Sequence, residues 1–421
     1  MRKNLVKGGV AAALDIGSSK VCCFIARVDE AGRPLVVGIG QQASRGIKGG
    51  AIVDMELAET SVLNAVHAAE QMSGETIDRV VVTLSGGYPA PSSVGVEVSL
   101  NGHEVGEADL RRAVAYGHQT QLQRQQEDHG RQMIHSIPTG YSIDGSRGIR
   151  DPRGMFGEQL GVHMHIITAS AGAVRNVSTC IERSHLAPVA FVVSPYASGL
   201  SSLVEDEMEL GVTVIDMGGG TTTIAVFYEN NVIFTDVIPV GGNHVTSDIA
   251  RGLSTPLAHS ERMKTLYGHV LAAPNDEREL IDVPQVGEEE TSGSQQLPRS
   301  LLVGIIQPRV EETLELVRSR LELSGFDKIA GRRVVLTGGA CQLPGTRELA
   351  STVLDKQVRI GRPSQISGLA EATAGPAYAT CAGLLNYAAT ADVAMPGEAS
   401  QEPREPGGLV GRLGHWLREH F

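Results

Sequence analysis

The chain carries one short pattern twice. It first reads Ala13-Leu14-Asp15-Ile16-Gly17-Ser18-Ser19-Lys20, and in the second half of the chain it returns as Val214-Ile215-Asp216-Met217-Gly218-Gly219-Gly220-Thr221-Thr222-Thr223. Each copy is an apolar run followed by Asp, one apolar residue, Gly and a turn rich in hydroxyl side chains, and a second apolar run follows each turn. This order of residues predicts a strand, a tight turn and a strand, formed twice.

Glycine turns of this kind favour phosphate binding, because no Cβ keeps the backbone N–H groups away from an anion. Hydroxyl side chains in the two turns add further donors, namely Ser18, Ser19, Thr221 and Thr222. Two such hairpins facing each other can hold a nucleotide from both sides, with Asp15 and Asp216 holding a hydrated Mg²⁺ between them. A single Asp-x-Gly turn usually only reverses the chain, so the repetition carries this prediction.

The composition excludes several classes of protein. A chain of 421 residues is too long for one simple core and predicts about two to four domains. Hydrophobic residues make up 41%, as in soluble globular proteins, and no apolar run approaches the ~20 residues of a membrane-spanning helix. The net charge of −12 argues against nonspecific binding of nucleic acid. Residues 1–7 are basic, but no signal-peptide cleavage site fits without removing the first hairpin.

The five cysteines predict neither disulfides nor a metal site. Their number is odd, and no Cys-x-x-Cys spacing occurs. Cys22 and Cys23 are neighbours in an expected strand, so their side chains should point to opposite faces of the sheet. Buried thiols in a reducing cytoplasm account for all five.

The order of the elements predicts an α/β protein with an insertion. Strands, a helix at residues 55–72 and a buried strand at 80–84 are typical of an α/β layer. From residue 87 the pattern changes to alternating strands and a polar helix, which predicts a small inserted α+β domain. Residues 254–321 are predicted to be largely helical, with interruptions.

A third glycine-rich segment follows a buried strand late in the chain. It reads Leu336-Thr337-Gly338-Gly339-Ala340-Cys341-Gln342-Leu343-Pro344-Gly345. A glycine pair at the carboxyl end of a strand can form a crevice for a flat ligand. Alone this signal is weak, but beside two phosphate-type hairpins it predicts a shelf for adenosine.

These three loops, in this order, resemble those of the actin, Hsp70 and hexokinase superfamily. Within it the chain resembles the FtsA family of actin-like bacterial cell-division proteins. Beyond the loops, the resemblance rests on residues 46–54, 148–155 and 239–246. It covers residues 10–388 and the extreme C-terminus.

The resemblance implies a two-lobed actin-like ATPase fold with a small inserted α+β domain and a C-terminal amphipathic helix. The implied segments are 1–86 and 165–197 for lobe 1, 87–164 for the inserted domain, 198–244 and 333–387 for lobe 2, 245–332 for its smaller domain, 388–408 for a linker and 409–421 for the helix. The inserted domain is expected to serve filament contacts and downstream partners.

The resemblance also implies a site for ATP or ADP with Mg²⁺. Its expected phosphate contacts are Gly17, Ser18, Ser19 and Lys20 from lobe 1 and Gly218, Gly219, Gly220, Thr221 and Thr222 from lobe 2. Gly242 and Asn243 are also expected to bind the nucleotide. The expected nucleoside-side residues are Gly338, Gly339, Ala340, Glu261 and Lys264. An ordinary i,i+3 surface ion pair is the alternative for Glu261 and Lys264. Asp15 and Asp216 are expected to bind Mg²⁺ through water, and no residue is identified to position an attacking water, so at most weak ATPase activity is expected.

The tail predicts a helix at the membrane interface. Apolar side chains gather on one side of residues 409–421, namely Leu409, Val410, Leu413, Trp416, Leu417 and Phe421. The segment is too short to span a bilayer but suits its interface. Docking on the protein's own body or on a partner is the alternative, which the preceding linker with Pro396, Pro403 and Pro406 disfavours.

The function implied by the resemblance is a division protein that polymerises on the cytoplasmic face of the cell membrane at the division site. It would tether the FtsZ ring there and recruit later division proteins. The FtsZ C-terminal peptide is expected to bind within residues 245–331, with Arg309 as a candidate contact and an ordinary solvated arginine as the alternative. Three other functions compete: a PilM-like scaffold of pilus assembly, a small-molecule kinase on the same scaffold, and a chaperone ATPase, for which the chain offers no large peptide-binding domain.

Overall fold

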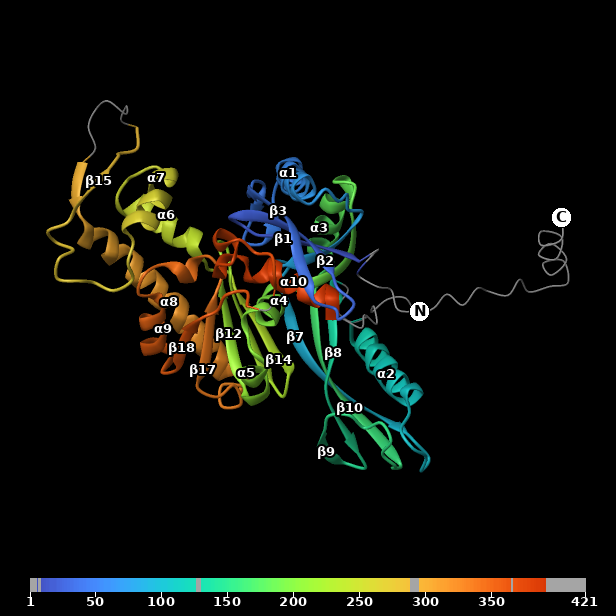
Figure 1. Cartoon of the computed structure of the whole chain (residues 1–421). Helices are drawn as coiled ribbons and strands as arrows, with labels where there is room; N and C mark the ends of the chain where they lie inside the picture. The colour runs from blue at the N-terminus through green and yellow to red at the C-terminus, as the bar shows by residue number, and fades with distance from the viewer. Residues whose placement is uncertain (1–5, 7–8, 126–129, 288–294, 365, 391–421) are drawn as a thin grey trace, which may run out of the picture.

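The computed structural model describes residues 6, 9–125, 130–287, 295–364 and 366–390. Two lobes lie side by side, and a smaller domain extends from each of them (Figure 1). Residues 391–421, which include most of the predicted linker and all of the predicted amphipathic helix, lie outside the described residues. No helix among the described residues combines the length and the apolar character needed to cross a membrane.

The first lobe is built on a five-stranded sheet of order β11-β6-β1-β2-β3. Its strands are β1 (Val10–Ile16), β2 (Lys20–Val28), β3 (Pro34–Ala43), β6 (Arg79–Leu84) and β11 (Ala187–Val193). β1 pairs antiparallel with β2 and parallel with β6, so the first repeated motif forms the predicted hairpin. Helices α1 (Met55–Ser73) and α3 (Ala171–Arg183) pack on one face of the sheet.

The second lobe repeats this topology. Its sheet has the order β14-β13-β12-β17-β18, with β12 (Val212–Met217), β13 (Thr222–Tyr228), β14 (Asn231–Ile238), β17 (Arg333–Thr337) and β18 (Gln357–Ile360). β12 pairs antiparallel with β13 and parallel with β17, as β1 does with β2 and β6. The two copies of the sequence motif therefore occupy equivalent places in two equivalent sheets.

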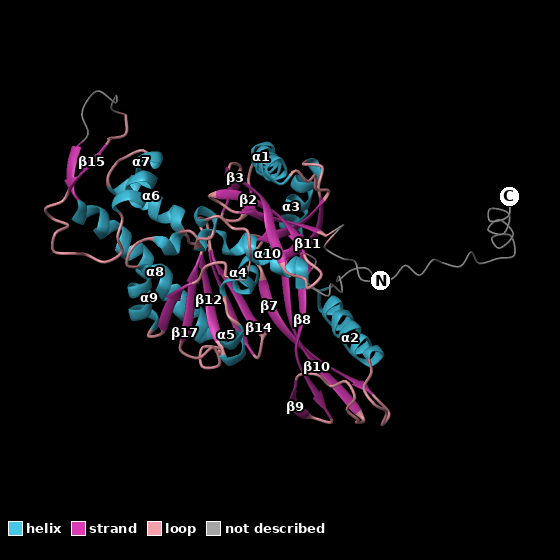
Figure 2. Ribbon diagram, viewed as in Figure 1, coloured by secondary structure: helices cyan, strands magenta, loops and turns pink. Residues whose placement is uncertain are grey.

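Two helices lie between the sheets, α4 (Ser194–Ser202) and α10 (Ala379–Thr390), as Figures 1 and 2 show. They pack very closely, because a Cβ on Gly383 of α10 would lie 1.7 Å from the carbonyl oxygen of Ala197 in α4. Cys22 contributes to the core shared with α10 and Cys23 to the core under α1, as their adjacent positions predict. All five cysteines are buried and free.

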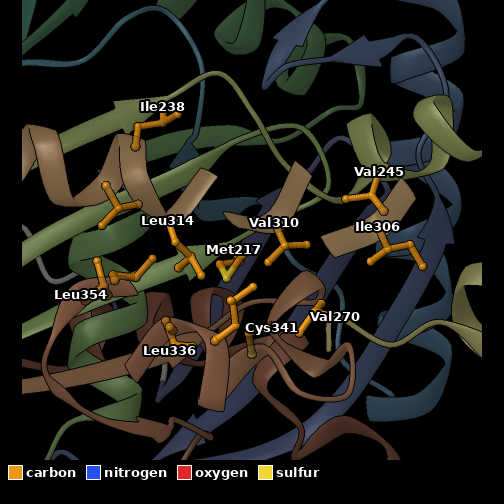
Figure 3. Packing of buried hydrophobic residues seen from close by; sticks show 14 of the residues in the cluster. Met217, Ile238, Val245, Val270, Ile306, Val310, Leu314, Leu336, Cys341 and Leu354 are labelled. Carbon is orange, nitrogen blue, oxygen red and sulfur yellow. The ribbon is translucent and has the colours of Figure 1, made fainter. Parts of the chain in front are cut away.

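The smaller domain of lobe 2 consists of α6 (Gly242–Gly252), α7 (Leu257–Tyr267), the long α8 (Arg299–Ser324) and a hairpin of β15 (Leu280–Val283) and β16 (Gln295–Pro298). Its core is continuous with that of the lobe: Val245, Ile306 and Leu314 gather with Met217 and Leu336 in Figure 3. The hairpin corrects the expectation of a largely helical segment at residues 254–321.

The inserted domain is an antiparallel sheet of order β7-β10-β8-β9 covered by α2 (Glu107–Gln125). Its strands are β7 (Ala90–Ser99), β8 (Arg131–Ile143), β9 (Ser146–Ile149) and β10 (Gln159–Ser170). Val94, Val96, Leu160 and Met164 lie in its core. The expected boundary at residue 164 falls within β10.

The remaining described elements are short. They are β4 (Ile47–Lys48), β5 (Ala51–Ile52), α5 (Glu205–Leu210), α9 (Thr346–Leu354) and three 3₁₀ turns, η1 (Ala340–Gln342), η2 (Glu371–Thr373) and η3 (Pro376–Tyr378). Three of them, β4 and β5 (which pair as a hairpin) and η3, lie close to the turn between β1 and β2.

Candidate functional site

A cavity of about 410 Å³ lies between the two repeated hairpin turns. This volume is in the usual range for a small-molecule site. Its wall contains every residue that the sequence predicts for the nucleotide: Asp15, Gly17, Ser18, Ser19, Lys20, Asp216, Gly218, Gly219, Gly220, Thr221, Thr222, Gly242, Asn243, Glu261, Lys264, Gly338, Gly339 and Ala340. Residues from both lobes and from the smaller domain of lobe 2 are therefore brought to one cavity.

The two turns have the same local geometry. The N–H of Gly17 donates to the carbonyl of Lys20 at 3.1 Å, and the N–H of Gly218 donates to the carbonyl of Thr221 at 2.9 Å. A Cβ on either glycine would lie within 3.0 Å of the accepting oxygen, so both turns exclude side chains there for the same reason. Residues of both turns line the cavity.

The turns also touch each other across the lobes. A Cβ on Gly220 would lie 2.3 Å from the Oγ atom of Ser18, and a Cβ on Gly219 would lie 2.9 Å from the Cβ of Ser19. Glycines of lobe 2 therefore accommodate serines of lobe 1. This close approach is what brings donors from both lobes around one small volume.

The β4–β5 hairpin supports the cavity wall from outside through its contact with Ser18. The N–H of Gly50, in the turn between β4 and β5, donates to Ser18 Oγ at 2.9 Å. The hairpin therefore fixes a side chain of the turn between β1 and β2. Residues 46–54 were identified only through their resemblance to the family. The run Gly46-Ile47-Lys48-Gly49-Gly50 is itself a turn signal, but nothing local indicates what it packs against.

Each of the two aspartates is fixed by hydroxyl donors. The hydroxyl of Thr83 donates to Asp15 Oδ1 at 2.9 Å. The hydroxyls of Ser198 and Thr380 lie 2.5 and 2.9 Å from Asp216 Oδ2. In each case the second carboxylate oxygen has no hydrogen-bond donor among the described residues, so each aspartate keeps an acceptor free.

Burial raises the pKa of both carboxyl groups. The pKa of Asp15 rises to about 6, mainly through burial, while the charge of Lys20 and the hydrogen bond from Thr83 oppose the rise. The pKa of Asp216 is raised by the same cause and lowered by its hydrogen bonds to Ser198 and Thr380. Two buried carboxylates that resist ionisation favour a nearby cation, which stabilises their charged form.

The pKa of Asp15 leads to a prediction for the Asp15→Asn variant without nucleotide. Because the folded state binds this proton more tightly than the unfolded chain, ionised Asp15 costs stability above the folded pKa and costs none below the unfolded value. Relative to the variant, the wild type should lose about 2 kcal/mol of unfolding free energy between pH 4 and pH 7. Denaturant unfolding of both proteins across this range measures the difference. A difference independent of pH would contradict the assignment.

Three further hydroxyl groups in the cavity wall have no partner. The Oγ atoms of Ser194, Thr222 and Thr223 are buried, and none has a hydrogen-bond partner within the part of the chain that is described. Only Thr222 was predicted. Unpaired buried hydroxyls are costly, so their presence in the wall suits a polar ligand or water between the two aspartates.

The hydrated Mg²⁺ of the prediction fits these residues. Within the described residues, the cavity wall offers two carboxylate oxygens and three hydroxyls without hydrogen-bond partners, and magnesium in proteins usually keeps several of its waters. No cluster of three or more His, Cys, Asp or Glu side chains suited to a metal occurs in the described part of the chain. The fit rests on the two carboxylate oxygens, which can accept hydrogen bonds from waters of the ion.

The part of the cavity wall predicted to contact the nucleoside contains a partly buried lysine, Lys264. Lys264 Nζ donates to Glu261 Oε2 at 2.7 Å, to Thr246 Oγ1 at 2.8 Å and to the carbonyl of Gly242 at 3.2 Å. The ion pair named as the alternative for Glu261 and Lys264 is thus present, and it forms part of the cavity wall. Gly338 lies in the same part of the cavity wall. Its φ of 87° falls in the left-handed region, which favours glycine.

Arg309 lies outside the cavity, on α8. Its Nε donates to Asp248 Oδ2 of α6 at 2.5 Å, and its Nη1 donates to Glu312. These bonds raise the pKa of Arg309 further. The guanidinium therefore joins two helices of the smaller domain, and its contact with a partner stays a prediction.

Comparison with known proteins gives two family matches. A model described as "Cell division protein FtsA" matches residues 213–383, and one described as "SHS2 domain inserted in FTSA" matches residues 86–168. The proteins named Cell division protein FtsA of Agrobacterium fabrum and Escherichia coli are 44% and 34% identical to the chain. Each match covers 98% of the chain and 95% or 98% of the relative.

Solved structures share the fold at low sequence identity. A PilM–PilN type IV pilus biogenesis complex matches with a TM-score of 0.64 at 17% identity, covering 90% of this chain and 99% of the other. MreB5 of Spiroplasma citri bound to ADP matches with a TM-score of 0.54 at 13% identity, covering 90% and 96%. These likenesses confirm the two-lobed actin-like fold.

Proposed function

Because the chain belongs to the FtsA family of cell-division proteins, we propose that it is an ATP-binding, actin-like scaffold that polymerises on the cytoplasmic face of the cell membrane. There it tethers the FtsZ ring and recruits later division proteins at the division site. The cavity between the repeated hairpins is the observation that carries nucleotide binding. MreB5, which shares the fold, has been solved with ADP, and this supports the same class of ligand.

At the proposed nucleotide site, separate groups of residues contact the phosphates, the Mg²⁺ and the adenosine. Backbone N–H groups of the two glycine turns and the hydroxyls beside them bind the phosphates, because an anion there receives donors from both lobes. Asp15 and Asp216 orient the hydrated Mg²⁺, which supplies positive charge against the phosphates. Gly338, Gly339 and Ala340 lie against adenosine. Occupancy of the cavity then sets how closely the two lobes approach each other.

Hydrolysis in this site is proposed to be weak. Phosphoryl transfer to water requires a group that positions the attacking water, besides Mg²⁺ and donors for the phosphates. Ser194, on α4, contributes an unpaired hydroxyl to the cavity wall, and a hydroxyl is a poor proton acceptor at neutral pH. We therefore assign the nucleotide mainly to assembly.

The smaller domain of lobe 2 is the proposed site for the FtsZ C-terminal peptide. Within residues 245–331 several large apolar side chains are exposed, among them Leu257, Leu266, Leu280 and Leu301. Exposed apolar side chains of this kind suit the burial of a short peptide. Arg309 can contribute only if the peptide displaces Asp248 or Glu312, because both carboxylates already bind it.

The inserted domain is proposed to serve contacts within the filament and with later division proteins. It projects from lobe 1 on the side opposite α1 (Figure 1), and Tyr88 and Phe156 expose large side chains there. The pilus-assembly alternative has less support, since the PilM match is 17% identical whereas the FtsA relatives reach 34–45% over nearly the whole chain.

A reconstitution with purified proteins tests the proposal. The full chain, vesicles containing anionic lipid, Mg²⁺ and FtsZ filaments are combined with ATP or without nucleotide. FtsZ should sediment with the vesicles only when the chain is present, and more strongly with ATP, because many tails on one polymer bind a membrane together. Calorimetry of ATP and ADP on the chain alone accompanies it. Absence of nucleotide binding, or equal recruitment of FtsZ without the chain, would contradict the proposal.

A further inference from the structure

The aromatic ring of Tyr378 contacts the ammonium group of Lys20, which follows the turn between β1 and β2. The Nζ atom of Lys20 lies 3.4 Å from the centroid of the Tyr378 ring. Tyr378 is itself fixed: its ring stacks on Phe24 with centroids 6.1 Å apart, and its hydroxyl donates to Gln41 Oε1. The ring therefore presents a rigid face to the ammonium group.

The hydrogen-bond donors of Lys20 are uncommitted. Throughout the described residues, no hydrogen bond or ion pair within 4.0 Å is found for Lys20 Nζ, although its pKa is lowered by burial. Lys264 in the same cavity differs, because its ammonium donates to three protein oxygens. A cation–π contact holds charge through the ring's electrostatic field and consumes no N–H donor.

We propose that Tyr378 is a positioning residue of the nucleotide site: it holds the Lys20 ammonium at the cavity wall with its donors free for phosphate. The inference rests on the proposed function, since it assumes that the cavity binds a nucleotide. Under this inference, the Lys20–Tyr378 pair makes the cavity prefer a nucleoside di- or triphosphate over a nucleoside. Tyr378 acts through Lys20, because Lys20 lines the cavity and the Tyr378 ring lies behind it.

The backbone around Tyr378 ties this cation to the nucleoside end of the cavity. Tyr378 closes η3, and the carbonyl of Pro376 in η3 accepts hydrogen bonds from Gly338 N–H and from the Thr337 hydroxyl, both at 3.2 Å. Gly338 belongs to the loop predicted to bind adenosine. The position of the Lys20 ammonium is thereby set relative to that loop, although the two belong to different lobes.

The test compares ADP with adenosine on the full chain in the presence of Mg²⁺. Tyr378→Leu should weaken ADP binding about 3- to 30-fold, the range of a partly desolvated cation–π contact, and leave adenosine affinity unchanged within about twofold. Tyr378→Phe keeps the ring and should bind ADP within about threefold of the wild type. The exposed Tyr116→Leu, on α2, is the matched control and should change neither affinity.

A double-mutant cycle with Lys20→Met separates positioning from general damage. Once the ammonium is absent, Tyr378→Leu should add no further loss of ADP affinity. Tyr378→Met, of similar bulk, replaces the leucine variant if thermal melting shows that the latter is unfolded. The inference is overturned if the non-aromatic variant binds ADP like the wild type, loses adenosine equally, or adds its effect to that of Lys20→Met. Failure of the wild type to bind ADP would instead overturn the proposed function, and the inference with it.

Discussion

Replacing Gly220 by valine is expected to lower the affinity for ADP and ATP by about 100-fold or more, equivalent to about 2.7 kcal/mol. A Cβ at this position would lie 2.3 Å from Ser18 Oγ and 3.0 Å from the Cα of Gly49. The new side chain must therefore push apart the second phosphate loop, the first phosphate loop and the β4–β5 hairpin. Separated loops cannot place donors from both lobes on one phosphate group.

The control for this variant is Gly304→Val in α8. Gly304 is exposed, and a Cβ there meets no atom within 4 Å. It should bind both nucleotides like the wild type. Calorimetry measures affinity, and thermal melting without nucleotide shows whether Gly220→Val still folds. Wild-type affinity in a folded Gly220→Val protein would show that the two loops do not act together on the ligand.

Truncation after Thr390 is expected to abolish binding to vesicles while leaving nucleotide affinity unchanged. The cut keeps α10 intact and removes the whole segment in which the sequence predicts the interfacial helix. Each large apolar side chain buried in the membrane interface contributes roughly 1.5–3 kcal/mol before ordering costs, so loss of six of them removes the binding free energy.

A point variant tests the same helix within the full chain. Trp416→Glu should reduce the vesicle-bound fraction about tenfold or more, because it places a charge on the apolar side and removes the residue type that favours the interface. His415→Gln, at a position outside the predicted apolar side, is the matched control and should sediment like the wild type. Unchanged sedimentation of Trp416→Glu would favour docking of the tail on protein.

Local patterns in the sequence predicted the parts of the fold that repeat. Both Asp-x-Gly motifs formed hairpins because turn chemistry and strand alternation act over a few residues. The equivalence of the two sheets follows from the same repetition. The secondary structure of residues 254–321 was harder to predict. The strands of the β15–β16 hairpin are so short that their amphipathic pattern cannot be distinguished from that of an interrupted helix.

The candidate site was also predictable only where neighbouring residues in the sequence form it. The glycine loops were predictable, since their residue types are dictated by backbone geometry within one turn. The groups that fix Asp15 and Asp216 were not, because Thr83, Ser198 and Thr380 come from other elements and resemble ordinary core hydroxyls in the sequence. Tyr378 was missed for the same reason: its contact with Lys20 joins residues from opposite ends of the chain.

The course of α10 has a mechanical consequence. The helix begins beside the cavity, where the hydroxyl of Thr380 donates a hydrogen bond to Asp216. It ends at Thr390, the last described residue. Twelve helical residues make a rod of about 18 Å. One rigid helix therefore connects the hydrogen bond to Asp216 in the cavity wall with residue 390, the last described residue.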